Sequence, residues 1–140
     1  MAEVLIIDDN IDFNAIYRRK LSKKNIFFDF CSSIKDAKVL FQYKTYKLVL
    51  VSDSLVQDKR KGIKSYFESL GFAGRVGVLT FGRQTRLELS EYNGTPLLGK
   101  ELNAKVFSDS VYCIMHGSND EIKSKFSHKS IMAKALPTRV

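Results

Sequence analysis

The fold is decided by two short stretches of sequence, Val4-Leu-Ile-Ile-Asp-Asp9 and Leu48-Val-Leu-Val-Ser-Asp53. Each stretch is a short apolar run that passes directly into polar or acidic side chains. Runs of this length, rich in β-branched residues, are typical of buried parallel strands. Parallel strands end at one edge of a sheet, where open α/β sheets bind ligands, so we expect Asp8, Asp9 and Asp53 to lie together. Carboxylates gathered in this way repel one another, and their oxygen ligands favour Mg²⁺ and phosphoryl chemistry.

Extended and helical patterns alternate along the rest of the chain. Further strands are expected at 26–30, 76–80 and 96–98. Apolar residues at helical spacing predict helices over 13–21, after Ser33, over 63–70 and over 107–115, with the first helix capped by Asp9 or Asn10. The segment 82–94 is ambiguous. Five strands alternating with helices predict an α/β fold, a doubly wound, five-stranded parallel sheet flanked by helices.

The length of 140 residues suits a single domain with a substantial core. We expect this domain to cover residues 1–116, and residues 117–140 to form a basic C-terminal extension. Ser118 and Glu121 have the spacing of a capping box, which predicts a short helix ending near Pro137.

The composition favours anionic partners, because 23 Lys and Arg against 15 Asp and Glu give a net charge of +8. Aromatic and basic residues are not interleaved as in a base-stacking platform, so nucleic acid is not the first expectation. No apolar stretch is long enough to cross a bilayer, and the N-terminus has no secretory leader pattern. Cys31 and Cys113 lie far apart in the sequence and do not have the spacing of metal ligands. We therefore expect both to be buried thiols in a reducing cytoplasm.

Over residues 3–116 the chain resembles the receiver domain of two-component response regulators. The matching positions are Asp8-Asp9 after the first strand, Asp53 after the third, Thr80 after the fourth and Lys100 after the fifth. The resemblance implies a flavodoxin-like three-layer sandwich. It also implies a phosphoacceptor that is not an enzyme beyond self-phosphorylation from small donors and self-dephosphorylation.

The resemblance further implies a Mg²⁺ site. Asp9 and Asp53 would bind the metal directly, Asp8 would act mainly through water, and the backbone carbonyl of Leu55 would complete the protein ligands. These roles agree with the chemistry, because a metal neutralises the charge on the carboxylates and the phosphoryl group.

Three residues would act on the phosphoryl group. Asp53 would be the phosphoacceptor, since a carboxylate can form an aspartyl phosphate. Lys100 would pair with a phosphoryl oxygen, and the Thr80 hydroxyl would donate a hydrogen bond to another and so sense the phosphate.

Several positions depart from the family pattern. Phe81 stands where a small residue is usual, and its ring is expected to narrow access to Asp53. Glu101 replaces the usual Pro after the Lys, and Leu97 replaces the aromatic residue that normally swings inward on activation. Tyr92 is an alternative carrier of that switch.

The loop after Asp53 differs as well. Gln57 replaces the usual Pro, Gly62 comes one residue late, and the basic run Lys59-Arg60-Lys61 lies between them. This run is interpreted either as a solvated turn or as a docking site for an acidic partner beside the phosphorylation site.

The preferred hypothesis is a cytoplasmic phosphoacceptor that receives its phosphoryl group from a histidine kinase or phosphotransfer protein and signals through contacts with a downstream protein. The alternative is a receiver-like module that never cycles phosphate and binds an acidic protein or nucleic acid through its basic surface. A haloacid-type phosphatase is disfavoured, because Leu55 occupies the position of the second Asp that such enzymes need.

Overall fold

The computed structural model describes residues 2–81, 92 and 94–125. Within these ranges the five strands form one sheet in the order β2-β1-β3-β4-β5, and every neighbouring pair is parallel. The strands are β1 (Val4–Ile7), β2 (Phe28–Cys31), β3 (Leu48–Ser52), β4 (Arg75–Thr80) and β5 (Leu97–Gly99). The predicted doubly wound parallel sheet is confirmed.

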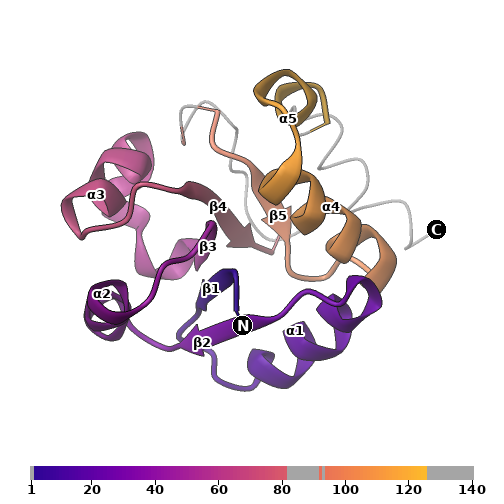
Figure 1. The fold of residues 1–140 in the computed structure, drawn as a ribbon, viewed down its shortest axis with the longest axis horizontal. Helices are drawn as coiled ribbons and strands as arrows, with labels where there is room; N and C mark the ends of the chain where they lie inside the picture. Colours follow the sequence, from indigo (N-terminus) through magenta and orange to yellow (C-terminus); the bar gives the residue numbers. More distant parts are fainter. Residues whose placement is uncertain (1, 82–91, 93, 126–140) are drawn as a thin grey trace.

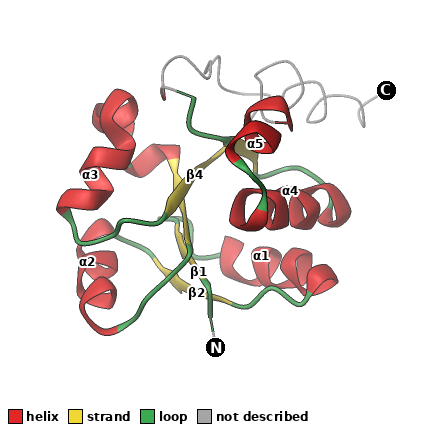
Figure 2. Cartoon of the chain, turned by 45° about the horizontal axis from the view of Figure 1, so that its top comes forward, coloured by secondary structure: helices red, strands yellow, loops and turns green. Residues whose placement is uncertain are grey.

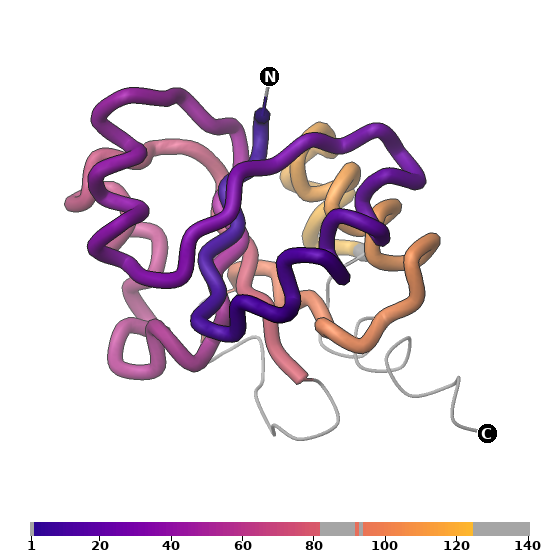
Figure 3. Tube along the Cα trace, turned by 90° about the horizontal axis from the view of Figure 1, so that it is seen from below, coloured from indigo at the N-terminus to yellow at the C-terminus, as the bar shows by residue number. Residues whose placement is uncertain are grey.

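Helices cover both faces of the sheet (Figure 1). They are α1 (Phe13–Leu21), α2 (Ile34–Tyr43), α3 (Ile63–Ser69), α4 (Ala104–His116) and α5 (Asn119–Lys125). Helices α2 and α3 lie on one face, while α1 and α4 lie on the other with α5 beyond α4, as Figures 2 and 3 show from two further directions. Three layers follow from strands that are apolar on both sides.

Alternate residues of each strand enter two separate cores. Val4, Ile6, Leu48 and Leu50 pack with α1 and α4, whereas the other face of the sheet packs with α2 and α3. The strand residues of the second face are Leu5, Ile7, Cys31, Val49, Val51, Val76, Val78 and Leu97. The period of two along each strand therefore divides the apolar residues between the two helical layers.

The helix boundaries follow local signals in most places. The Ser33 side chain accepts a hydrogen bond from the Asp36 backbone N–H (3.1 Å) at the start of α2. Gly71 adopts a positive φ of 100° just after α3, a conformation that a side chain would strain. The sequence placed Ser33 directly before a helix, and Gly71 was predicted to terminate one.

The predicted cap of α1 is wrong. The N-cap residue is Asp12, whose side chain makes no capping bond, and the Asn10 side chain instead accepts from the Asp12 backbone N–H (3.1 Å). The carboxylate of Asp9 accepts from a side chain of another loop. The residues between β1 and α1 thus serve the strand-end edge of the sheet rather than the helix.

The C-terminal extension begins as the sequence predicts. The Ser118 and Glu121 side chains each accept a hydrogen bond from the other's backbone N–H, at 3.1 and 2.9 Å, which is the reciprocal capping box. Ile122 of α5 packs against the core. The expected end of this helix near Pro137 and most of the segment 82–94 lie outside the described residues.

None of the helices within residues 2–81, 92 and 94–125 is long and apolar enough to cross a membrane.

Candidate functional site

The carboxyl ends of the strands surround a pocket of about 310 Å³. Four residues predicted for the site line it, namely Asp9, Asp53, Thr80 and Lys100, together with Phe81. Asp9 follows β1, Asp53 follows β3, Thr80 ends β4 and Lys100 follows β5, so the parallel sheet brings together residues far apart in the sequence. The pocket therefore combines two carboxylates and an ammonium group with the hydroxyls of Ser52, Ser54 and Thr80.

Asp8 lies beneath the pocket and is fully buried. Its Oδ2 atom accepts a hydrogen bond from the Tyr17 hydroxyl (2.6 Å) and lies 3.1 Å from Nζ of Lys100, while its Oδ1 atom accepts from the Asn10 backbone N–H (3.0 Å). Burial and the neighbouring carboxylate raise the pKa of Tyr17, which therefore stays a donor. Asp8 is thus a buried, paired anion.

Lys100 is only 6% exposed, which rules out a role as an ordinary surface lysine. Its Nζ also donates to the Ser52 hydroxyl (2.9 Å) and lies 5.2 and 5.1 Å from the ring centroids of Phe13 and Phe81. The Phe81 ring therefore covers the ammonium group on one side. The backbone around Lys100 is held by the Thr80 carbonyl, which accepts from its N–H at 2.8 Å.

Two hydroxyl groups connect Lys100 with Asp9. Ser54 donates to Oδ1 of Asp9 (2.9 Å), and the Ser52 and Ser54 hydroxyls are 2.9 Å apart. A serine has a single hydroxyl proton, so Ser52 must donate to Ser54. The polar path runs from Lys100 through both serines to Asp9, and it keeps Asp9 at the pocket mouth.

Asp53 is held by residues that were not predicted for the site. Arg60 forms a bidentate pair with it, Nε donating to Oδ1 at 3.0 Å and Nη2 to Oδ2 at 2.9 Å. The hydroxyl of Tyr92, which is fully buried, also donates to Oδ1. The hydrogen bond to Asp53 raises the pKa of Arg60, and burial followed by the contact with Asp53 raises the pKa of Tyr92. Both side chains therefore remain donors to the carboxylate.

The expected switch position is apolar. Leu97 is buried in β5, where it pairs with Val78, so it cannot replace the missing aromatic residue as a hydrogen-bonding group. Tyr92, the alternative carrier, instead presents its hydroxyl to the candidate phosphoacceptor. A hydrogen bond therefore connects Tyr92 directly to Asp53.

The proposed metal ligands are only partly brought together. Across residues 2–81, 92 and 94–125, no three His, Cys, Asp or Glu side chains form a group that could hold a metal ion. Asp9 and Asp53 line one pocket and supply the oxygen donors that Mg²⁺ prefers, whereas Asp8 faces Lys100 and Tyr17. Leu55 follows Asp53 in a 3₁₀ turn, Asp53–Leu55, and its side chain packs on the core. The donor chemistry fits a divalent cation, with Arg60 occupying the carboxylate that the cation would need.

Sequence reasoning identified the residues at the strand ends and missed those that contact them from elsewhere. Tyr17 was placed only on the buried face of a helix, and the basic run containing Arg60 was interpreted as a solvated turn or a docking site. One signal was present, because an Arg seven residues after Asp53 is close enough to fold back onto it. The sequence does not indicate which of the three basic side chains, Lys59, Arg60 or Lys61, contacts Asp53.

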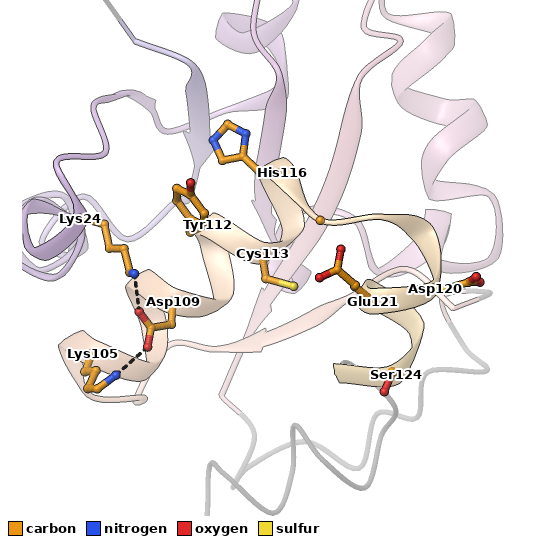
Figure 4. Close-up of a pocket in the computed structure, with 10 residues that line it drawn as sticks. Lys24, Lys105, Asp109, Tyr112, Cys113, His116, Asp120, Glu121 and Ser124 are labelled. Carbon is orange, nitrogen blue, oxygen red and sulfur yellow. Dashed lines mark hydrogen bonds and ion pairs between the residues drawn. The ribbon is translucent and has the colours of Figure 1, made fainter.

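A wider groove of about 920 Å³ is lined by residues of α4 and α5 together with Lys24 (Figure 4). Its main charged group, Asp109, is already paired with Lys24 (3.1 Å) and Lys105 (2.9 Å). The rings of Tyr112 and His116 contact each other with centroids 4.6 Å apart. The groove has no strand-end carboxylates, so the smaller pocket at Asp53 is the candidate site.

Comparison with known proteins shows which solved structures have a similar fold. Neither the protein-family models nor the curated proteins include a significant match to the sequence. Among solved structures, the chain is similar to a response regulator from Burkholderia pseudomallei solved with a phosphorylated aspartic acid, a calcium ion and citrate. That match has a TM-score of 0.64 and 17% identity, and it covers 92% of this chain and 75% of the other.

Two further solved structures agree. The signal receiver domain of the putative response regulator NarL from Mycobacterium tuberculosis matches with a TM-score of 0.63 and 15% identity, covering 82% of this chain and 96% of that one. An atypical orphan response regulator, described with a phosphorylation-independent regulatory mechanism, matches with a TM-score of 0.62 and 21% identity over 83% and 98% of the two chains. The five-stranded parallel sheet described above therefore has the fold of response-regulator receiver domains.

Proposed function

We propose that this chain is a cytoplasmic signalling receiver that accepts a phosphoryl group on Asp53. The observation that carries the proposal is the shared pocket, in which Asp53 lies with Asp9, Thr80 and Lys100 at the carboxyl ends of parallel strands. The two free cysteines, Cys31 and Cys113, agree with a reducing compartment.

The chemistry requires a donor with a labile phosphoryl bond, such as a phosphohistidine of a kinase or phosphotransfer protein. An oxygen of Asp53 forms a bond to phosphorus while the bond from phosphorus to the imidazole nitrogen breaks. The electron pair stays on the leaving nitrogen, which takes up a proton. A divalent cation held by Asp9, Asp53 and the Leu55 carbonyl would neutralise charge on the carboxylate and the phosphoryl oxygens.

The remaining residues would orient the product. Thr80 ends β4 at the pocket wall, and its hydroxyl is a suitable donor to a phosphoryl oxygen. Lys100 has its ammonium group at the same wall, already oriented by Asp8 and Ser52. A phosphoryl group on Asp53 would displace Arg60 and Tyr92 from the carboxylate and so change the surface offered to a downstream protein.

The test is intact-mass analysis of the full chain after incubation with acetyl phosphate and Mg²⁺. The expected result is a metal-dependent gain of one phosphoryl group that Asp53→Asn abolishes and Asp58→Asn preserves. Asp58 is a matched control because its side chain is 81% exposed and lies in the same loop. Equal gains in wild type and Asp53→Asn would exclude Asp53 as the acceptor.

A second candidate function is a binding module that works without phosphorylation. The observation that favours it is the complete occupation of Asp53 by Arg60 and Tyr92, which gives the carboxylate partners without a phosphoryl group or metal. In that case the net charge of +8 would attract an acidic protein or nucleic acid. Salt-sensitive binding to DNA by both wild type and Asp53→Asn, with no phosphoryl adduct in either, would favour this function.

A further inference from the structure

The contact between Arg60 and Asp53 uses both oxygens of the carboxylate. Two parallel N–H donors of one guanidinium bind a carboxylate more strongly and with better-defined geometry than a single ammonium does. The Asp53 side chain is 9% exposed and that of Arg60 is 27% exposed, so water screens the pair only in part. The guanidinium therefore lies where a cation bound to Asp53 would have to come.

The segment that carries Arg60 lies outside the buried core. Arg60 belongs to a 3₁₀ segment, Gln57–Gly62, that contains no buried residue. The flanking residues Val56 and Ile63 are almost completely buried and anchor its two ends. Six residues are long for a 3₁₀ helix, whose hydrogen bonds are poorer than those of an α-helix. Withdrawal of Arg60 would therefore break its hydrogen bonds to Asp53 and expose little apolar surface.

Lys100 does not perform the same task. Its ammonium group lies at the pocket wall, where it is bound to Asp8 and Ser52. Two of the three strand-end carboxylates thus have a protein cation of their own, Lys100 for Asp8 and Arg60 for Asp53. Of the two, Arg60 lies on an exposed loop segment and Lys100 is buried, so Arg60 is the cation that can leave.

We propose that Arg60 is an intramolecular competitor of the divalent cation at Asp53, and that the cation gains this carboxylate when the Gln57–Gly62 segment withdraws the guanidinium. The inference rests on the proposed function, since it concerns the metal that the phosphoacceptor would use. Arg60 is a positioning residue in this scheme: it sets how tightly the cation binds and how often Asp53 is open to a phosphodonor.

The experiment is a calorimetric titration of the full chain with MgCl₂ at constant ionic strength, comparing wild type, Arg60→Gln and Lys59→Gln. Lys59→Gln is the matched control, because it removes the same charge from the residue next to Arg60. The Lys59 side chain is 45% exposed and lies over the Tyr66 ring. Removal of a partly exposed bidentate competitor is expected to tighten Mg²⁺ binding by about tenfold in Arg60→Gln. Lys59→Gln should stay within about twofold of wild type, as expected for a screened surface charge.

Two further variants separate competition from a structural role. Arg60→Lys keeps the charge and loses the bidentate geometry, so its affinity should lie between those of wild type and Arg60→Gln. In the Asp53→Asn background, Arg60→Gln should no longer change Mg²⁺ affinity, because the contested carboxylate is gone. A loss of loop structure would instead weaken binding in every background.

The outcomes distinguish this inference from the proposed function. Equal Mg²⁺ affinity in wild type and Arg60→Gln, or no binding by either, overturns the competition. Tighter binding by Arg60→Gln supports it whether or not phosphate is accepted. The acetyl phosphate reaction on the same proteins then tests the phosphoacceptor separately, and no adduct in either protein would reject that function while leaving the competition standing.

Discussion

At the residue scale, the site is organised by charges that are paired inside the protein. Asp8 is completely buried, and its compensating cation is Lys100, which is far from it in the sequence. A buried carboxylate without such a partner is costly, so Lys100 stabilises the folded state by compensating Asp8. The pair also orients the ammonium group at the pocket wall.

Replacement of Lys100 by Met is therefore expected to destabilise the protein by about 3–5 kcal/mol, because it leaves the Asp8 carboxylate buried and unpaired. The double variant Asp8→Asn/Lys100→Met should recover most of that loss, since the uncompensated charge is removed. Urea denaturation of both variants checks this. A single variant as stable as wild type would show that the carboxylate has another compensating cation.

The thiol of Cys31 should react slowly in the folded chain. Burial raises the pKa of Cys31 to about 11, and a backbone hydrogen bond at Ser33 opposes part of the shift. Because the thiolate is the reactive form, a raised pKa lowers its population at pH 8 by about a hundredfold relative to an ordinary cysteine. Alkylation followed by peptide mass analysis should label Cys31 slowly in the folded chain and rapidly in urea. Similar rates in both states would contradict the burial of this thiol.

The residues that sequence reasoning could identify are those whose position depends on a strand end. Asp53, Thr80 and Lys100 each follow an apolar run, so the topology alone places them at one edge of the sheet. Arg60 and Tyr92 reach Asp53 through the path of a loop and the choice of side-chain rotamers. Neither is encoded in a periodic pattern, which is why their contact with Asp53 was not predicted.

At the scale of single elements, apolar periodicity predicted the existence of each strand and helix better than its ends. The second strand was expected from Ile26 and begins at Phe28, because Asn25 takes a left-handed conformation and Ile26 bonds back to Leu21 at the end of α1. The loop after Asp53 contains two 3₁₀ turns where only a loop was expected. Such turns depend on local hydrogen bonds that a hydrophobic pattern does not report.

The cap of α2 offers a direct test of one of these local signals. Ser33→Ala removes the hydrogen bond to the Asp36 N–H and is expected to cost about 1 kcal/mol of folding stability, whereas Ser33→Gly should cost roughly a few tenths. Chemical denaturation of the two variants measures the difference. If the alanine variant were as stable as wild type, the side-chain cap would not contribute.

At the scale of the whole molecule, the alternation of strands and helices predicted the three layers and the position of the pocket. Two cores, one on each face of the sheet, leave the strand ends as the place where polar side chains converge. The extension begins with the predicted capping box, and Ile122 attaches it to the core shared by α1 and α4. The net charge of +8 does not itself select a partner, since the basic residues are spread along the chain.

The most direct test of the proposed phosphoacceptor is to locate the phosphoryl group. After reaction with acetyl phosphate and Mg²⁺, borohydride reduction converts an aspartyl phosphate to homoserine, and trypsin releases the peptide 48–59, which contains Asp53 and Asp58. Fragmentation of that peptide is expected to place homoserine at position 53, with Asp58 unchanged. Homoserine at another position, or an unmodified peptide from a chain whose intact mass shows the adduct, would contradict the assignment of Asp53.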